Sequence, residues 1–67
     1  MDKIGEIIKA ERKARGLSQT ELAKLIGVTQ DSISLWEKGK RLPDTQYVIK
    51  LAQLFNVSAD YLLGLTD

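Results

Sequence analysis

The sequence predicts a compact all-α domain of five short helices, and three observations support this prediction. Apolar residues recur at helical spacing along most of the 67-residue chain. Residues typical of helix caps and helix ends divide the chain into short segments, and no segment alternates apolar and polar residues as a strand does. The length allows a single domain over residues 1–67, with helices expected at about residues 3–15, 19–26, 30–38, 45–55 and 59–63.

The first expected helix begins beside Asp2, whose side chain can cap its N-terminus. Gly16 stands just past its expected end, where helices commonly finish in a left-handed residue. The apolar positions that follow helical spacing are Ile4, Ile7, Ile8 and Ala14.

The second expected helix opens with a capping box. In the run Ser18-Gln19-Thr20-Glu21, the side chains of Ser18 and Glu21 can each bond the other residue's backbone N–H. Gly27 ends this helix. Its apolar residues are Leu22, Ala23, Leu25 and Ile26.

The three remaining helices are separated by short breaks. Thr29 can cap the third helix and Ser58 the fifth. Pro43 marks the loop after the third helix, because the residue before a proline resists helical conformation. The fourth helix has a broad apolar face made of Tyr47, Val48, Leu51, Ala52, Leu54 and Phe55.

Composition excludes several classes of function. The chain contains no cysteine and no histidine, so disulfides, thiolate or imidazole metal sites and nucleophilic mechanisms based on either residue are excluded. Its nine carboxylates are scattered, and no glycine-rich phosphate loop is present. The sequence therefore predicts no enzyme, no catalytic residue, no metal and no cofactor, and no small-molecule pocket is evident. A net charge of +1 is no argument for nucleic acid, so only the placement of charges could be one.

The second and third helices carry the functional prediction. Only Gly27-Val28 separates Ile26 from the cap Thr29, which is too short for two helices to lie side by side. A steep crossing joined by so short a turn is a helix-turn-helix. Ala23 is small where the two helices would approach most closely.

Three stretches carry a resemblance to a known family. They are Leu17-Ser18-Gln19-Thr20-Glu21-Leu22-Ala23, Ile26-Gly27-Val28-Thr29-Gln30 and Ile33-Ser34-Leu35-Trp36-Glu37-Lys38-Gly39. The chain resembles, over nearly its whole length, the Cro/phage-repressor (XRE-like) type of helix-turn-helix domain. The resemblance implies a lambda-repressor-like fold, with the helix-turn-helix formed by helices two and three, and binding of double-stranded DNA through the third helix.

The resemblance also implies which residues contact bases: Gln30, Asp31, Ser34 and Leu35. Helical geometry puts Asp31, Ser34 and Leu35 well away from the buried face that Ile33 and Trp36 define, with Gln30 at its flank.

Each of these four side chains has more than one interpretation. Gln30 has the donor and acceptor that suit adenine N6 and N7, or it is a solvated amide. Ser34 can bond a base, a phosphate or nothing, and Leu35 can cover a thymine methyl or be an ordinary exposed leucine. Asp31 departs from the neutral or basic residue expected beside phosphates. It can accept from cytosine N4 or favour the positive end of the helix dipole.

Contacts with the DNA backbone are expected on both sides of the third helix. Gln19 lies at a helix N-terminus, where N–H groups attract phosphate. A basic cluster follows the third helix, and its Arg41 could alternatively enter the minor groove. The predicted phosphate contacts are Gln19, Thr29, Ser32, Lys38, Lys40 and Arg41.

Two residues near the site are expected to be structural. Glu37 lies in the last turn of the third helix, where the dipole disfavours an acid, so it needs a cation. By resemblance that cation is Arg12, in a partly buried ion pair. Trp36 is expected in the core, because duplex DNA offers no free base face for stacking.

These observations predict a sequence-specific DNA-binding transcriptional regulator, a repressor. The alternative is an antitoxin-type DNA-binding protein whose main role is to bind a partner protein. The chain lacks a membrane span or signal peptide, so a soluble protein in the cytoplasm, at the nucleoid, is expected. The apolar ending suits a homodimer that reads a pseudo-palindromic operator, although it also suits a protein partner or a further domain. Its residues are Tyr61, Leu62, Leu63 and Leu65.

Overall fold

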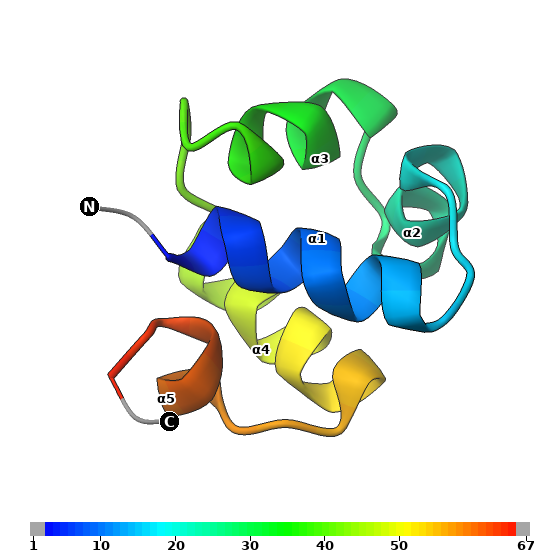
Figure 1. Ribbon diagram of the computed structural model, residues 1–67. Helices are drawn as coiled ribbons and strands as arrows, with labels where there is room; N and C mark the ends of the chain where they lie inside the picture. Colours follow the sequence, from blue (N-terminus) through cyan, green and yellow to red (C-terminus); the bar gives the residue numbers. More distant parts are fainter. Residues whose placement is uncertain (1–2, 66–67) are drawn as a thin grey trace.

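The computed structural model describes residues 3–65, which form five helices and no strand (Figure 1). The helices are α1 (Ile4–Ala14), α2 (Gln19–Ile26), α3 (Gln30–Glu37), α4 (Thr45–Phe55) and α5 (Ala59–Leu62). They differ from the expected ranges by single residues at the ends of α1, α3 and α5. No helix in this part of the chain is long and apolar enough to cross a membrane.

Hydroxyl side chains cap three of the helices, as expected. Ser18, Thr29 and Ser58 each accept a hydrogen bond from the backbone N–H three residues later, at 3.0, 3.2 and 3.0 Å. In α2 the Glu21 carboxylate accepts in return from the Ser18 N–H at 2.8 Å, and this bond lowers the pKa of Glu21. The start of α2 is therefore closed by a complete capping box.

The ends of α1 and α4 are formed differently. Lys3 occupies the N-cap position of α1 without a side-chain cap, and Asp2, the expected cap, lies outside the described residues. Asp44 precedes α4, but its side chain makes no capping hydrogen bond. Asn56 ends α4 in the left-handed conformation with φ of 58°, a conformation that asparagine tolerates better than most residues.

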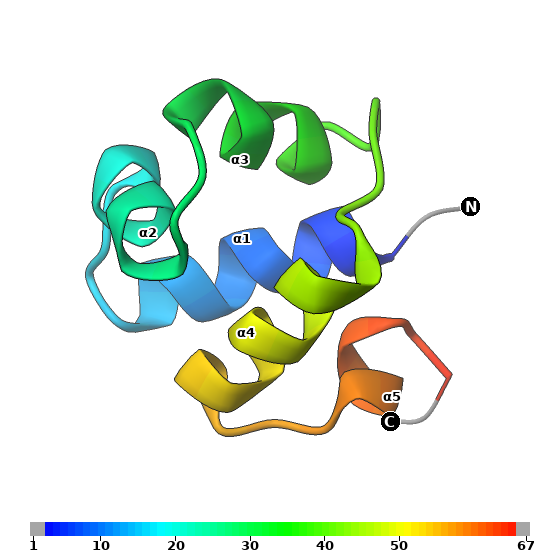
Figure 2. The ribbon, with the colours of Figure 1, turned by 180° about the vertical axis from the view of Figure 1, so that it is seen from behind.

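One hydrophobic core joins all five helices. The helix α3 packs against both α1 and α2, and α4 packs against α2 and α5. Two opposite views show α1 running between α3 on one side and the α4–α5 pair on the other (Figures 1 and 2). The buried apolar residues are Ile4, Ile8, Leu22, Ala23, Ile26, Ile33, Trp36, Val48, Leu51, Ala52, Phe55 and Leu62.

Three apolar residues do not lie where the sequence suggested. Ala14 is exposed and Leu25 is 58% exposed, because each lies more than about 100° around its helix from the centre of the buried face. Leu62 was expected on a dimer surface, but it is fully buried in the core. It therefore cannot contact a second subunit without unfolding α5.

Gly5 permits a close approach of α1 and α3. A Cβ at this position would overlap the backbone carbonyl oxygen of Trp36 and would lie 3.1 Å from that of Glu37. The N-terminal turn of α1 thus packs directly on the C-terminal turn of α3, with no side chain between the two backbones. Glycine is needed here for its small size.

Arg15 joins the end of α1 to the end of α4. Its guanidinium donates to the Phe55 carbonyl oxygen at 2.6 Å and lies over the Phe55 ring, 4.9 Å from the ring centre. The same guanidinium forms an ion pair with Glu11 at 2.6 Å. Arg15 thus satisfies one of the carbonyl groups that a helix leaves free at its C-terminus.

Gly5→Ala is expected to lower the free energy of unfolding by about 1–3 kcal/mol, the usual cost of overpacking. In an open helical position the same change raises stability by about 0.5–1 kcal/mol, so the sign of the effect tests the close approach. Urea unfolding followed by tryptophan fluorescence measures it, with the exposed Lys9→Ala as control. A Gly5→Ala variant more stable than the native chain would contradict the packing described.

Candidate nucleic-acid interface

The turn between α2 and α3 sets the angle of the two helices. Gly27 ends α2 in the left-handed conformation, with φ of 80°. The N–H groups of Gly27 and Val28 both bond to the Ala23 carbonyl oxygen, at 2.9 and 3.0 Å. Ala23 is 3% exposed, in agreement with the close approach expected there. Because Thr29 then caps α3 at once, the second helix leaves the first steeply, as in a helix-turn-helix (Figure 1).

The exposed face of α3 is formed by the residues expected to contact bases. Gln30 and Asp31 are exposed, whereas Ser34 and Leu35 are half-buried. On the opposite side, Ile33 and Trp36 are 0% and 2% exposed. The helix therefore presents a polar surface with one apolar side chain, Leu35, to the solvent.

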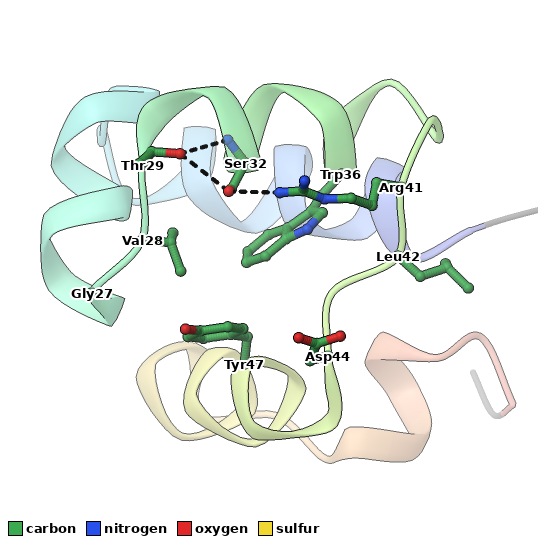
Figure 3. Close-up of a pocket in the computed structure, with 9 residues that line it drawn as sticks. All are labelled: Gly27, Val28, Thr29, Ser32, Trp36, Arg41, Leu42, Asp44 and Tyr47. Carbon is green, nitrogen blue, oxygen red and sulfur yellow. Dashed lines mark hydrogen bonds between the residues drawn. The ribbon is translucent and has the colours of Figure 1, made fainter.

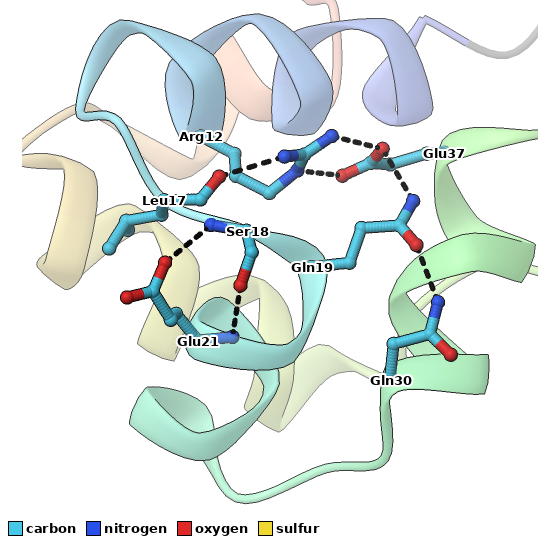
Figure 4. A network of polar contacts seen from close by, with 7 residues as sticks. All are labelled: Arg12, Leu17, Ser18, Gln19, Glu21, Gln30 and Glu37. Atoms are coloured by element: carbon cyan, nitrogen blue, oxygen red, sulfur yellow. Dashed lines mark hydrogen bonds and ion pairs between the residues drawn. The ribbon is translucent and has the colours of Figure 1, made fainter.

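A buried ion pair holds the end of α3 (Figure 4). Arg12 donates to both Glu37 carboxylate oxygens, from Nε at 2.7 Å and from Nη2 at 3.0 Å, and from Nη1 to the Leu17 carbonyl oxygen at 2.8 Å. The two charged side chains are 10% and 4% exposed. The hydrogen bond with Glu37 raises the pKa of Arg12, and burial acts in the opposite direction. This pair ties α1 and the loop before α2 to α3.

Gln19 extends the ion pair to the start of α3. Its Nε2 donates to Glu37 Oε1 at 3.0 Å, and its Oε1 accepts from Gln30 Nε2 at 2.5 Å (Figure 4). A carboxylate can only accept, so Glu37 fixes which end of the Gln19 amide faces it. The Gln19 oxygen must then face Gln30, and Gln30 must turn its NH₂ group toward Gln19. The Gln30 amide is therefore oriented by the buried ion pair.

The other flank of α3 carries hydroxyl and basic groups. Arg41 Nη2 donates to Ser32 Oγ at 2.7 Å, and Ser32 Oγ lies 3.1 Å from Thr29 Oγ1 (Figure 3). Lys38 and Lys40 are exposed nearby. The expected phosphate-contacting residues thus divide into two groups: Gln19 lies beside Gln30, and the others follow the Ser32 flank or the loop after α3.

Two features of this region were missed by the sequence analysis. The bracing role of Gln19 was not foreseen, because its partner Glu37 is eighteen residues away in the sequence. Nothing in the sequence indicated the cavity of about 440 Å³ that opens between α3 and α4 (Figure 3). Its walls come from separate segments of the chain, so no local pattern indicates it. The lining residues are Gly27, Val28, Thr29, Ser32, Trp36, Arg41, Leu42, Asp44 and Tyr47.

Comparison with known proteins agrees with this geometry. The profile of the helix-turn-helix family matches residues 8–62. The chain belongs to the helix-turn-helix family. The HTH-type transcriptional regulator ImmR of Bacillus subtilis is 39% identical to this helix-turn-helix domain over 61 residues, which cover 91% of the chain and 48% of ImmR.

Two further relatives bear on the function of this domain. The P22 c2 repressor, from a Salmonella phage and solved in complex with a synthetic operator, superimposes with a TM-score of 0.88 at 35% identity. That match covers 94% of this chain and 96% of the other. The antitoxin PezA of Streptococcus pneumoniae is 36% identical over 61 residues, covering 91% of this chain and 39% of PezA. The chain thus spans about half the length or less of ImmR and PezA.

Arg12→Ala is expected to lower the free energy of unfolding by about 3–5 kcal/mol, because it leaves the Glu37 carboxylate buried without a cation. Thermal or urea unfolding measures the loss, and the exposed Lys13→Ala on the same helix is the control. The double variant Arg12→Met/Glu37→Leu should recover most of the stability, since it removes both charges. An Arg12→Ala variant within about 1 kcal/mol of the native chain would contradict this account.

Proposed function

We propose that this helix-turn-helix domain belongs to a transcriptional regulator, a repressor, and binds double-stranded DNA sequence-specifically with α3 in the major groove. One observation carries the proposal: the close superposition on the c2 repressor of phage P22, whose structure contains operator DNA. The exposed polar face of α3 supports the same orientation. Because the proposed ligand is chromosomal DNA, we place the protein at the nucleoid in the cytoplasm.

Gln30 is the first of the proposed base contacts. One of its N–H groups is directed to Gln19, which leaves its carbonyl oxygen and its second N–H for a base. This donor–acceptor pair matches adenine N6 and N7. Guanine presents two acceptors at the corresponding atoms, so a Gln30 amide held by Gln19 can satisfy only one of them. The network therefore favours adenine over guanine at this position.

Three other side chains complete the proposed base-reading surface. Leu35 is the apolar member, suited to a thymine methyl group, and Ser34 is placed to bond a base edge. Asp31 is exposed in the first turn of α3, where its carboxylate can accept from cytosine N4. It also repels phosphate, so it favours binding only where a cytosine compensates for that repulsion.

The phosphate contacts are proposed on both flanks of α3. Gln19 has one amide N–H that its two hydrogen bonds leave free, so it can still donate to a phosphate. On the other flank, the hydroxyl groups of Thr29 and Ser32 and the basic loop after α3 are proposed to face the other strand of the DNA. Arg41 in this loop could reach a phosphate or the minor groove. The full proposed set is Gln19, Thr29, Ser32, Lys38, Lys40 and Arg41.

Dimerisation through the C-terminal region is the proposed assembly. Leu63 and Leu65 are 47% and 72% exposed, and Tyr61 is half-buried beside them in sequence. Leu62 is excluded because it is buried. Two recognition helices placed about 34 Å apart by such a dimer would read a pseudo-palindrome in successive major grooves.

An antitoxin role is the second candidate, and the similarity to PezA is the observation that favours it. Such a protein would also bind DNA, so DNA binding does not separate the two functions. A stable complex with a second protein from the same operon would favour the antitoxin role, whereas the absence of such a complex would favour the regulator.

Selection from a randomised duplex library tests the proposal. The 67-residue chain is incubated with the library near physiological salt, and bound DNA is sequenced. We expect enrichment of a two-fold symmetric site with half-sites about one helical turn apart. Recovery of random sequence alone would overturn sequence-specific binding by this domain.

Two variants then separate base reading from phosphate contact on the selected site. Gln30→Ala should lose about 1–3 kcal/mol of discrimination for one base pair in each half-site and little affinity elsewhere. Lys40→Gln should weaken binding to all sequences and reduce the slope of log K against log salt by about one per site. Both side chains are exposed, so unchanged melting temperatures are the folding control. If Gln30→Ala left the selected sequence unchanged, the proposed role of Gln30 would be wrong.

The double variant Leu63→Glu/Leu65→Glu should shift the chain toward monomer in sedimentation equilibrium, because two carboxylates would enter an apolar contact. Its affinity for a symmetric duplex should fall, while its affinity for a single half-site stays unchanged. Leu25→Glu, at a leucine that is 58% exposed on α2, is the matched control. A native chain that is monomeric at high concentration, both free and on a symmetric duplex, would refute the dimer.

A further inference from the structure

We propose that the cavity between α3 and α4 binds a small aromatic carboxylate that also carries a hydrogen-bond donor. The cavity lies on the Ser32 flank of α3, bounded by the α2–α3 turn, the loop before α4 and the first turn of α4 (Figure 3). Its volume of about 440 Å³ falls in the range of small-molecule sites. Three of its lining residues, Thr29, Ser32 and Arg41, are among the proposed phosphate contacts, but the proposed DNA binding gives the cavity itself no role.

The inner wall of the cavity is aromatic. The rings of Trp36 and Tyr47 pack against each other in a tilted arrangement, with centroids 5.8 Å apart and an interplanar angle of 38°. Val28 adds an apolar side chain from the α2–α3 turn (Figure 3). A planar ring in the cavity, placed beside this pair and not between its rings, would contact both aromatic side chains, an arrangement worth more than apolar contact alone.

The Trp36 indole N–H has no hydrogen-bond partner among residues 3–65. Trp36 is 2% exposed, yet its N–H makes no hydrogen bond with residues 3–65. Within that part of the chain no fully enclosed side-chain N or O lacks a hydrogen bond, so this N–H must reach open space. Trp36 lines the cavity, and a nearly buried N–H normally finds a partner. The group is therefore a donor available to a bound molecule.

The upper wall supplies a cation. Arg41 makes no ion pair with any residue in the described range 3–65, although its guanidinium is held by the hydrogen bond to Ser32. Ser32 is linked in turn to Thr29. The planar guanidinium has further N–H groups, and these suit a carboxylate, which it can bind with two parallel bonds. A carboxylate at this wall could also accept from one of the Ser32 and Thr29 hydroxyls, since the proton of the other is used in the bond between them.

The opposite wall supplies an acceptor. Asp44 lines the cavity, makes no capping bond to α4 and forms no ion pair within the described residues (Figure 3). A purely anionic ligand would be repelled by this carboxylate. A ligand with an N–H or O–H at the far end of its ring would instead donate to Asp44. The two walls together therefore select a molecule with a carboxylate at one end and a donor at the other.

Occupancy of the cavity would oppose DNA binding, an inference that rests on the proposed function. Arg41 is one of the groups proposed to contact the DNA backbone. A guanidinium that holds a ligand carboxylate is less available to phosphate, so the ligand and DNA should each weaken the other's binding by the same factor.

The indole N–H of Trp36 gives a direct test, because the chain contains one tryptophan and so one indole peak in a ¹H–¹⁵N NMR spectrum. The 67-residue chain is titrated without DNA with 4-aminobenzoate, benzoate, aniline or inorganic phosphate. We expect 4-aminobenzoate to move the peak saturably, with a Kd at least about tenfold lower than that of aniline, the value of one charge-assisted hydrogen bond. Benzoate, which lacks the donor, should bind more weakly than 4-aminobenzoate. The proposal would be overturned if 4-aminobenzoate did not move the indole peak saturably, or if inorganic phosphate moved it equally. The second result would make the Arg41 wall a phosphate site.

Variants test the role of each wall in binding the ligand. Arg41→Gln should raise the Kd for 4-aminobenzoate at least about tenfold. Asp44→Asn should remove most of the repulsion between the Asp44 carboxylate and benzoate. The difference in Kd between benzoate and 4-aminobenzoate should therefore become smaller. Lys40→Gln, an adjacent basic residue outside the cavity lining, is the matched control and should leave the Kd unchanged. Equal effects of Arg41→Gln and Lys40→Gln would refute a specific carboxylate site.

A DNA measurement completes the test. 4-Aminobenzoate should weaken binding of the native chain to its selected duplex and have no effect on the Arg41→Gln variant. Because the NMR titration contains no DNA, it decides the ligand site even if the chain proves not to bind DNA specifically. A saturable indole shift without any change in DNA affinity would support the ligand site but refute the coupling between ligand binding and DNA binding.

Discussion

The arrangement of α1, α2 and α3 depends on the ion pair between Arg12 and Glu37. Glu37 ends α3, where the helix dipole opposes a negative charge, and it is almost fully buried. Without Arg12 this carboxylate would have to reach solvent, and α3 would lose its fixed position over α1. Buried ion pairs add little net stability compared with apolar residues of the same volume, so we expect the main effect of this pair to be the selection of one arrangement of the helices.

The contact at Gly5 acts on the same turn of α3. The glycine permits the close approach of α1 and α3, and the ion pair joins the same two helices through charged side chains. The start of α3 is held separately, by the Thr29 cap and by the bond between Gln19 and Gln30. Both ends of the helix are thus held by the fold, and on its exposed face only Gln30 takes part in holding it.

The sequence predicted what depends on local chemistry. The cap residues, the turn at Gly27 and the helical spacing of apolar residues placed each helix end within a residue, because these signals act between residues a few positions apart. The ion pair came from the family resemblance. What was missed is non-local: the role of Gly5, the link from Gln19 to Glu37, and the cavity, each formed by segments far apart in the chain. Leu62 was misplaced because an apolar residue near a chain end suits a core and an interface equally well.

The exposed face of α3 has a consequence for how such domains diversify. The side chains of Asp31, Ser34 and Leu35 make no hydrogen bond or ion pair with the rest of residues 3–65. Substitution of the exposed Asp31 therefore carries little structural cost, and substitutions of the half-buried Ser34 and Leu35 break no polar contact, whereas changes at Gly5, Arg12 or Glu37 disturb the helix packing itself. Maintenance of the fold and choice of target are encoded in different residues. A lineage can accordingly acquire new targets through changes on one helical face while the contacts that fix the helices stay unchanged.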